Sequence, residues 1–160
     1  MPHSSGADSG ELVKITFHLP EEDQTDSVKS EGMWAFDLGD GRYRLDNVPF
    51  FLYGVSIEDI VSAELVDGIL VFREIVSRGG HSTYRIYMKG PDRARAAGLE
   101  ERLAEIKALG ASLERANRVL IAIDIPPEAD IFAIYKLLEA GEDATLWTFD
   151  EGHVGHQIDT

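Results

Sequence analysis

The segment of residues 79–85 brings together side chains that could do chemistry. Two glycines are followed by His81, Ser82, Thr83 and, two positions on, Arg85. An imidazole beside a hydroxyl is the raw material of nucleophilic catalysis, and a guanidinium offers a fork of donors to a carboxylate or phosphate. Backbone amides after two glycines could also cradle an anion. The segment is therefore a candidate binding site, although no acid at catalytic spacing completes a catalytic set.

The same residues also fit a structural role. The glycines would allow the chain to reverse between two units, while the hydroxyls and Arg85 would bond exposed backbone or a carboxylate. If so, we expect Arg85 to pair with a carboxylate of the first half of the chain, and Asp46 is the predicted partner. His81 precedes the strand and is expected to lie nearer solvent.

A second polar group lies at residues 42–47. On a strand, Arg42, Arg44 and Asp46 would share one face, because alternate residues point the same way. This pattern is typical of a salt-bridged surface and also of a site that orients a polar ligand. Asn47 precedes Val48 and a proline, so its side chain is expected to bond its own backbone in a turn.

Two further groups have a possible chemistry and a structural alternative. The apolar residues 50–53 could line a pocket or dock a partner, but such runs more often plug a core. Asp150, Glu151, His153 and His156 resemble the ligands of a metal site. Histidines three residues apart converge only on a helix, and the glycines at 152 and 155 argue against one. We therefore expect no metal and no cofactor.

The strands and helices that position these groups can be predicted from the spacing of apolar residues and from the turn residues between them. Ranges of period-two alternation, separated by Gly-Asp-Gly at 39–41 and Asp-Gly at 67–68, predict five strands and β-hairpins within residues 11–78. Residues 83–88, 112–116, 118–125 and 146–149 also read as strands. Helices are expected from Asp92 as the cap to Leu109, and over 129–139 with Gly141 ending the second one.

Together these elements predict an α+β protein with three parts. Residues 1–10 are expected to be a disordered tail. Residues 11–80 would form a small antiparallel β-barrel-like sheet, packed on a ferredoxin-like β-α-β-β-α-β unit of residues 81–155.

The residues from Asp40 to Phe51 and from Gly80 to Arg85 resemble the corresponding parts of a bacterial family known as domain-of-unknown-function family 4265. The resemblance extends over most of residues 11–155 and is strongest over Gly41 to Phe51 and over His81 to Arg85. The family's label names no activity, so the resemblance implies no catalytic or binding residue.

Composition excludes several classes of partner. The formal net charge is −14, and both halves of the chain are acidic, so the field repels nucleic-acid phosphates. No segment approaches the roughly 20 apolar residues of a membrane span. The chain contains no cysteine, which excludes a disulfide framework. We expect a cytoplasmic protein that binds neither nucleic acid nor membrane.

Two hypotheses for function follow. The first is a non-enzymatic acidic interaction module that binds a basic protein, for example as an immunity-type antidote to a basic toxin. The second is a small-molecule-binding protein or enzyme whose site lies in the groove between the two units, around His81 to Arg85, where pockets tend to form.

Overall fold

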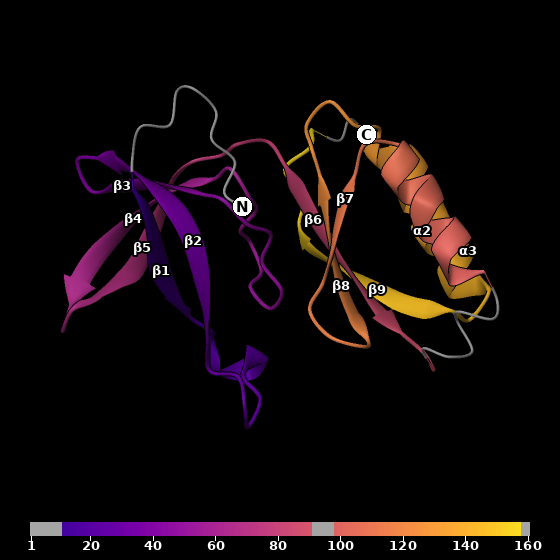
Figure 1. Ribbon diagram of the computed structural model, residues 1–160, viewed down its shortest axis with the longest axis horizontal. Coiled ribbons are helices and arrows are strands. Elements are labelled where there is room, and N and C mark those ends of the chain that lie inside the picture. The colour runs from indigo at the N-terminus through magenta and orange to yellow at the C-terminus, as the bar shows by residue number, and fades with distance from the viewer. Residues whose placement is uncertain (1–10, 91–97, 158–160) are drawn as a thin grey trace.

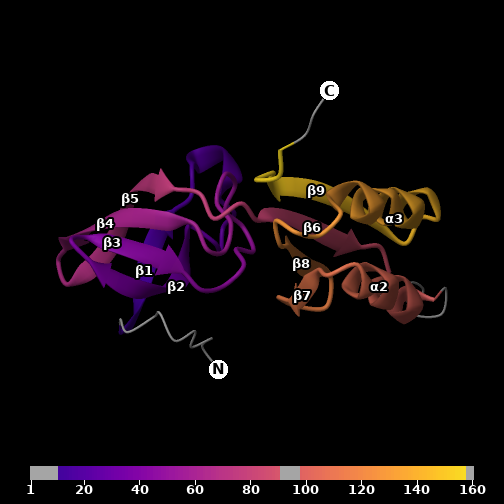
Figure 2. The same cartoon turned by 90° about the horizontal axis from the view of Figure 1, so that it is seen from above.

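The chain folds into a barrel, a sheet and a pair of helices that follow one another in three layers (Figures 1 and 2). The computed structural model describes residues 11–90 and 98–157. The four-stranded sheet lies between the barrel on one side and the helices on the other. A mixed α and β protein with two mainly antiparallel sheets, as predicted, is confirmed. The predicted tail at 1–10 and the cap at Asp92 lie outside the described residues.

The first five strands form a closed barrel in the order in which they occur along the chain. Its ends meet where the first and last strands pair in parallel at Ile15↔Leu70 and Thr16↔Val71. The elements of this unit are β1 (Leu12–His18), the 3₁₀ turn η1 (Glu21–Asp23), β2 (Ser30–Gly39), β3 (Arg42–Leu45), β4 (Ile60–Val66) and β5 (Ile69–Ser77).

Two hairpin turns of the barrel have the conformation that their sequences predict. Asp40 and Gly41 have φ angles of 57° and 74°, and Asp67 and Gly68 have φ angles of 52° and 82°. A two-residue turn with positive φ at both positions matches the right-handed twist of paired strands, and Asp-Gly adopts it readily. These turns set the pairing of β2 with β3 and of β4 with β5.

The barrel core comes from the alternate inward positions of its strands. Ile15, Met33, Leu45 and Val61 are fully buried. Phe17 stacks on Phe72 with ring centroids 4.5 Å apart. Burial of such side chains stabilises the fold by roughly 1.5–3 kcal/mol each.

The second sheet has the strand order β7-β8-β6-β9, with every neighbouring pair antiparallel. Its strands are connected through two helices, which cover the face turned away from the barrel (Figure 2). The elements are β6 (Ser82–Met88), α2 (Leu99–Ala108), β7 (Ser112–Arg115), β8 (Leu120–Ile125), α3 (Ile131–Asp143) and β9 (Trp147–His153).

The end of this unit differs from the sequence prediction in two places. Gly141 was expected to end the second helix, but it lies inside α3. The position suits a glycine because the indole of Trp147 packs against it, and a Cβ there would lie 2.0 Å from the ring. The Trp147 Nε1 also donates to the carbonyl of Leu138 at 2.9 Å. The last strand was expected to end at Phe149, but β9 continues to His153 and pairs with β6 over its length. None of the described helices is long and apolar enough to cross a membrane.

Candidate functional site

Residues 82–85 belong to strand β6, and their side chains point alternately to the two faces of the sheet. Tyr84 and Ile86 point into the helix-covered core, whereas Thr83 and Arg85 point toward the barrel, as the alternation of a strand requires. Ser82, Thr83 and Arg85 are all fully buried. Thr83 and Arg85 therefore lie within the junction of the two units, whereas Ser82 lies beside it.

Arg85 is bound by the loop that follows β3. Its guanidinium donates to the carbonyls of Pro49, at 3.4 Å, and of Leu52. The ring of Tyr53 covers it, with the guanidinium carbon 4.6 Å from the ring centroid. Because three residues of one barrel loop contact a side chain of the sheet, Arg85 joins the two units.

The carboxylate beside Arg85 is Asp150 of β9, and the predicted pairing with Asp46 is wrong. Asp150 Oδ1 lies 3.8 Å from Arg85 Nε, because the two residues are cross-strand neighbours. Tyr53 donates its hydroxyl to Asp150 Oδ2 at 2.6 Å. This hydrogen bond, aided by burial and the negative charge of Asp150, raises the pKa of Tyr53 above its ordinary value, although Arg85 opposes the shift. The first half of the chain binds Arg85 through main-chain carbonyls instead of a carboxylate.

Gly152 makes room for this arrangement. A Cβ at position 152 would lie 2.8 Å from Arg85 Nη2 and 3.3 Å from the Thr83 methyl group. Its carbonyl accepts from the amide of Gly54 at 2.8 Å, which adds a main-chain bond between the units. A glycine inside a strand often marks such a close approach.

Ser82 is brought together with His156 and not with His81. Its Oγ lies 2.7 Å from His156 Nδ1 and accepts from the amides of Gly155 and His156 at 2.9 and 3.2 Å. His156 Nε2 lies 2.9 Å from the carbonyl oxygen of Pro126, so Nε2 is the donor and the Ser82 hydroxyl donates to Nδ1. The pair resembles a nucleophile with its base, but Ser82 has no exposed surface that a substrate could reach. These bonds attach the segment after β9 to β6.

Thr83 is likewise engaged within the junction. Its hydroxyl lies 2.7 Å from that of Ser56 in the loop before β4, and both side chains are buried. The residues Ser82, Thr83 and Arg85 thus make three separate attachments across or beside the junction.

His81 pairs with Asp124 of β8. Its Nδ1 lies 2.8 Å from Asp124 Oδ1, and the two side chains are 16% and 11% exposed. Burial lowers the pKa of His81, but the hydrogen bond and charge of Asp124, together with Glu58 and Glu128, outweigh it and raise the pKa above 6.5. His81 is nearer solvent than Arg85, as expected, and it places a positive charge behind the Asp124 carboxylate when protonated.

Two carboxylates that order the junction loops were not foreseen from the sequence. Glu31 accepts from the successive amides of Phe50, Phe51 and Leu52 at 2.6, 2.9 and 3.1 Å. Within this loop Leu52 is buried, but Phe51 is 36% exposed and Tyr53 49% exposed. The expectation that all of residues 50–53 plug the core is therefore wrong. The loop lies over β6, and its hydrogen bonds to Glu31 fix its conformation.

The second unforeseen carboxylate is the fully buried Asp59. It accepts from the amides of Ser56 and Gly79 and from Arg78 Nη1, each at 3.0 Å. A buried carboxylate that has lost its contact with water needs hydrogen-bond donors, and these three groups supply them. Asp59 therefore connects the loop before β4 to the segment that leads into β6.

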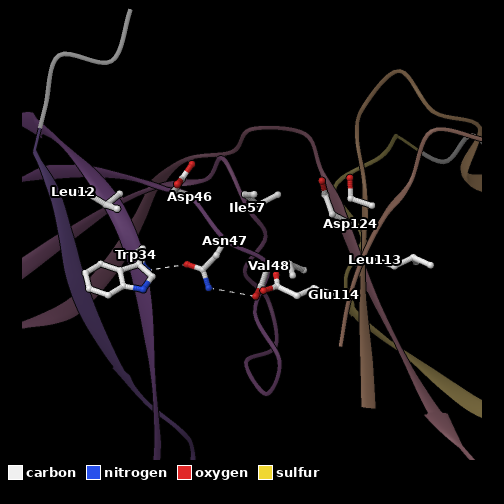
Figure 3. A pocket seen from close by; sticks show the side chains of 10 residues that line it. Leu12, Trp34, Asp46, Asn47, Val48, Ile57, Leu113, Glu114 and Asp124 are labelled. Carbon is white, nitrogen blue, oxygen red and sulfur yellow. Dashed lines mark hydrogen bonds between the residues drawn. The ribbon is translucent and has the colours of Figure 1, made fainter. Parts of the chain in front are cut away.

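A cleft of about 460 Å³ opens between the barrel and the sheet (Figure 3). Trp34, Asp46 and Asn47 lie on its barrel side, and Glu114 and Asp124 lie on its sheet side. The full lining consists of Leu12, Trp34, Asp46, Asn47, Val48, Ile57, Ser112, Leu113, Glu114 and Asp124.

Asn47 fixes the barrel wall of this cleft. Its Oδ1 accepts from the amide of Trp34 at 2.8 Å, and its Nδ2 donates to the carbonyl of Val48 at 3.5 Å (Figure 3). It thus bonds the neighbouring strand as well as its own turn. The side chain of Trp34 is left 50% exposed at the cleft.

The remaining predicted residues divide between the cleft and the surface beside it. Asp46 lines the cleft, as does Asp124, the partner of His81. Arg44 Nε lies 3.4 Å from Glu58 Oε2, and its guanidinium lies over the ring of Phe36 at 5.5 Å. Trp34 and Glu114 reach the cleft from different units and were not predicted as site residues from the sequence.

The histidines and carboxylates of residues 150–156 do not converge on one point. Asp150 binds Tyr53, and His156 binds Ser82 and the carbonyl of Pro126. Among the residues that the structure describes, no group of three or more such side chains could hold a metal ion.

Comparison with known proteins agrees with this architecture. The family described as Domain of unknown function (DUF4265) has a model that matches residues 31–149. A solved structure described as "Novel crystal structure of a hypothetical protein from Neisseria gonorrhoeae" superposes with a TM-score of 0.76 at 19% sequence identity, covering 92% of this chain and 98% of that chain. At this identity the likeness concerns the fold. A comparison with curated proteins gives no match.

Proposed function

Because the chain belongs to the DUF4265 family, whose description assigns no activity, we propose a function from the geometry of the chain itself. In this proposal the protein is a non-enzymatic, acidic interaction module that binds a basic protein partner. The cleft between the barrel and the sheet receives a basic side chain of that partner. An immunity-type antidote to a basic toxin is one module of this kind.

The observation that carries the proposal is the lining of the cleft. Asp46, Glu114 and Asp124 line it, with Asp124 hydrogen-bonded to His81, and none of its described lining residues is basic. The half-exposed indole of Trp34 lies at the same cleft. A cleft lined by charge of one sign concentrates the field and attracts the opposite charge, and an indole face attracts a cation by up to about 2 kcal/mol when water is excluded.

The rest of the chain supports recognition by charge. The net charge of −14 is distributed over both halves, so a basic partner is attracted from a distance. In the part of the chain that the structure describes, the Ser82 hydroxyl contacts an imidazole, and it is buried and hydrogen-bonded to His156 and to the amide of Gly155. Its shielding favours the non-enzymatic proposal.

The proposal also includes the detailed architecture of the chain and its location in the cell. We assign residues 81–155 to the ferredoxin-like arrangement, and the strand order β7-β8-β6-β9 with two crossover helices supports this assignment. The barrel before it would present Trp34 and Asp46 to the cleft. A cytoplasmic location fits a composition without cysteine.

A small-molecule-binding function is the second candidate, and the size of the cleft favours it. A volume of about 460 Å³ is within the range of ligand pockets, roughly 300–1,000 Å³. In that case Asp124, oriented by His81, would bind a cationic group of the small molecule.

Calorimetric titration with a hexa-arginine peptide distinguishes the candidates. We expect Glu114→Gln and Trp34→Leu each to weaken binding by roughly two- to fivefold, as loss of about 0.5–1 kcal/mol predicts. Glu105→Gln on α2 is the matched control, since it changes net charge equally and lies outside the cleft. A hexaglutamate peptide should not bind.

Two results would speak against the interaction module. Equal weakening by Glu105→Gln and Glu114→Gln would show that only the overall charge matters and not the cleft. If agmatine, a small guanidinium compound, bound as tightly as the peptide and was equally weakened by Glu114→Gln, the small-molecule function would be favoured instead.

A further inference from the structure

A second, smaller hollow lies on the helix-covered side of the sheet, away from the cleft. It has a volume of about 260 Å³ and forms where the first turn of α3 meets β6 and β9. Its lining consists of Tyr84, Ile131, Phe132, Tyr135 and Glu151. Its lining residues differ from those of the cleft.

Aromatic rings form most of its walls. Tyr84 and Tyr135 have ring centroids 6.2 Å apart and planes inclined by 72°. Tyr84 is only 2% exposed, so it lies beneath Tyr135, and the accessible rings of the hollow are those of Tyr135 and Phe132. Phe149 supports Tyr135 from behind in an edge-to-face contact at 5.5 Å and 82°. Phe132 lies one helical turn before Tyr135 and is 56% exposed, an unusual position for a phenylalanine.

One carboxylate accompanies these rings. Glu151 is the cross-strand neighbour of Tyr84 and is exposed at the hollow. Burial of Tyr84, followed by the negative charge of Glu151, raises the pKa of the Tyr84 hydroxyl, so the ring stays neutral. No described lining residue is basic. The hollow therefore combines electron-rich ring faces with one negative charge.

We propose that this hollow binds a methylated ammonium group. Such a cation has an apolar surface that fits aromatic walls, and its charge is attracted by the ring faces and by Glu151. Inclined rings with a carboxylate are the arrangement by which proteins recognise quaternary ammonium ligands. An anion would be repelled by Glu151, and a purely apolar ligand would gain nothing from its charge. The volume suits a small cationic headgroup or the end of one methylated lysine side chain.

The proposal is tested by NMR titration of the full-length protein with choline at constant ionic strength. The neutral carbon isostere 3,3-dimethylbutan-1-ol measures what apolar contact alone contributes. We expect choline to shift the signals of Phe132, Tyr135 and Glu151, and to bind more tightly than the isostere. A peptide with one trimethyl-lysine, compared with its unmodified form, shows whether the group comes from a small molecule or from a protein.

Three variants separate the contributions. Phe132→Leu keeps an apolar side chain of similar size but removes the ring, and should weaken choline binding by roughly two- to fivefold without affecting the isostere. Glu151→Gln should weaken choline binding alone. Glu105→Gln, with the same charge change on α2, should leave it unchanged. Because Phe132 and Glu151 are exposed, both variants should fold normally, which a thermal melt checks.

Two outcomes would overturn the proposal. One is the absence of choline-dependent and trimethyl-lysine-dependent shifts at the hollow. The other is equal binding of choline and the isostere, both insensitive to Glu151→Gln. Neither outcome would bear on the cleft, because its test replaces Glu114 and Trp34 and uses an arginine peptide.

Discussion

Replacing Arg85 with alanine should destabilise the protein more than any other single change in the 81–85 segment. The guanidinium is fully buried and donates to the main-chain carbonyls of Pro49 and Leu52. In the alanine variant these carbonyls lose their donor, and each unsatisfied buried group costs about 1–3 kcal/mol. Tyr53 also loses the cation under its ring.

The carboxylate partner contributes less to this cost. Asp150 is 36% exposed and keeps its bond to Tyr53, so water replaces part of the lost ion pair. We therefore expect a total loss of about 3–5 kcal/mol, the range found when one partner of a buried pair is removed. For a chain of this length the loss lowers the melting temperature by roughly 6–20 °C.

Urea unfolding and thermal melting of Arg85→Ala and His81→Ala provide the assay. His81 is 16% exposed and makes one ion pair, so its replacement should cost roughly 1 kcal/mol. A loss below about 1 kcal/mol in Arg85→Ala, or a larger loss in His81→Ala, would refute the conclusion that Arg85 joins the two units.

Two further changes probe the same junction. Gly152→Ala should destabilise the protein by about 1–3 kcal/mol, since its Cβ would lie 2.8 Å from the immobile guanidinium of Arg85, and an unchanged urea midpoint would contradict this. His81 has a raised pKa in the folded protein, so its pairing with Asp124 contributes stability that is fully present below about pH 6.5 and is lost as pH rises through the folded pKa. Urea unfolding between pH 5.5 and 8.5 should show the advantage over His81→Asn shrinking as pH rises, and a growing advantage would show the sign to be wrong.

Local features were the ones that could be predicted from the sequence. Asp40-Gly41 and Asp67-Gly68 determine their own turns, and period-two alternation identifies the strands that they join. The helix over residues 131–143 was predicted from its apolar period, but its end was not. The role of Gly141 is to make room for Trp147, which packs on it from the following strand, and this contact cannot be read from the local sequence.

Long-range pairing explains the failures at the junction. Asp150 is the neighbour of Arg85 only through the register of β6 with β9, and no short-range pattern reveals that register. Glu31 binds amides about 20 residues away, and Ser82 binds a histidine 74 residues away. Gly152 makes room for Arg85, but its neighbours Glu151 and His153 are not typical strand residues, so the sequence did not show that this glycine lies inside a strand.

The cleft illustrates the same limit for function. Asp46 and Asn47 were identified as candidates from their own segment, and both lie at the cleft. Trp34 and Glu114 have no sequence relation to them, since one comes from the barrel and the other from the sheet. The acidic composition indicated a basic partner, but the place where it would bind depends on how the two units are packed.

The most direct test of the proposed function is an NMR titration that follows the indole signals of the two tryptophans while the hexa-arginine peptide is added. Trp34 is half-exposed at the cleft, whereas Trp147 is buried under α3 and serves as an internal control. We predict that the Trp34 signal shifts and the Trp147 signal does not. We also predict that the affinity falls steeply between 0.01 M and 0.15 M salt, where the screening length drops from about 30 to about 8 Å. A Trp34 signal that stays unchanged at saturating peptide, or binding that ignores salt, would contradict recognition of a basic partner at this cleft.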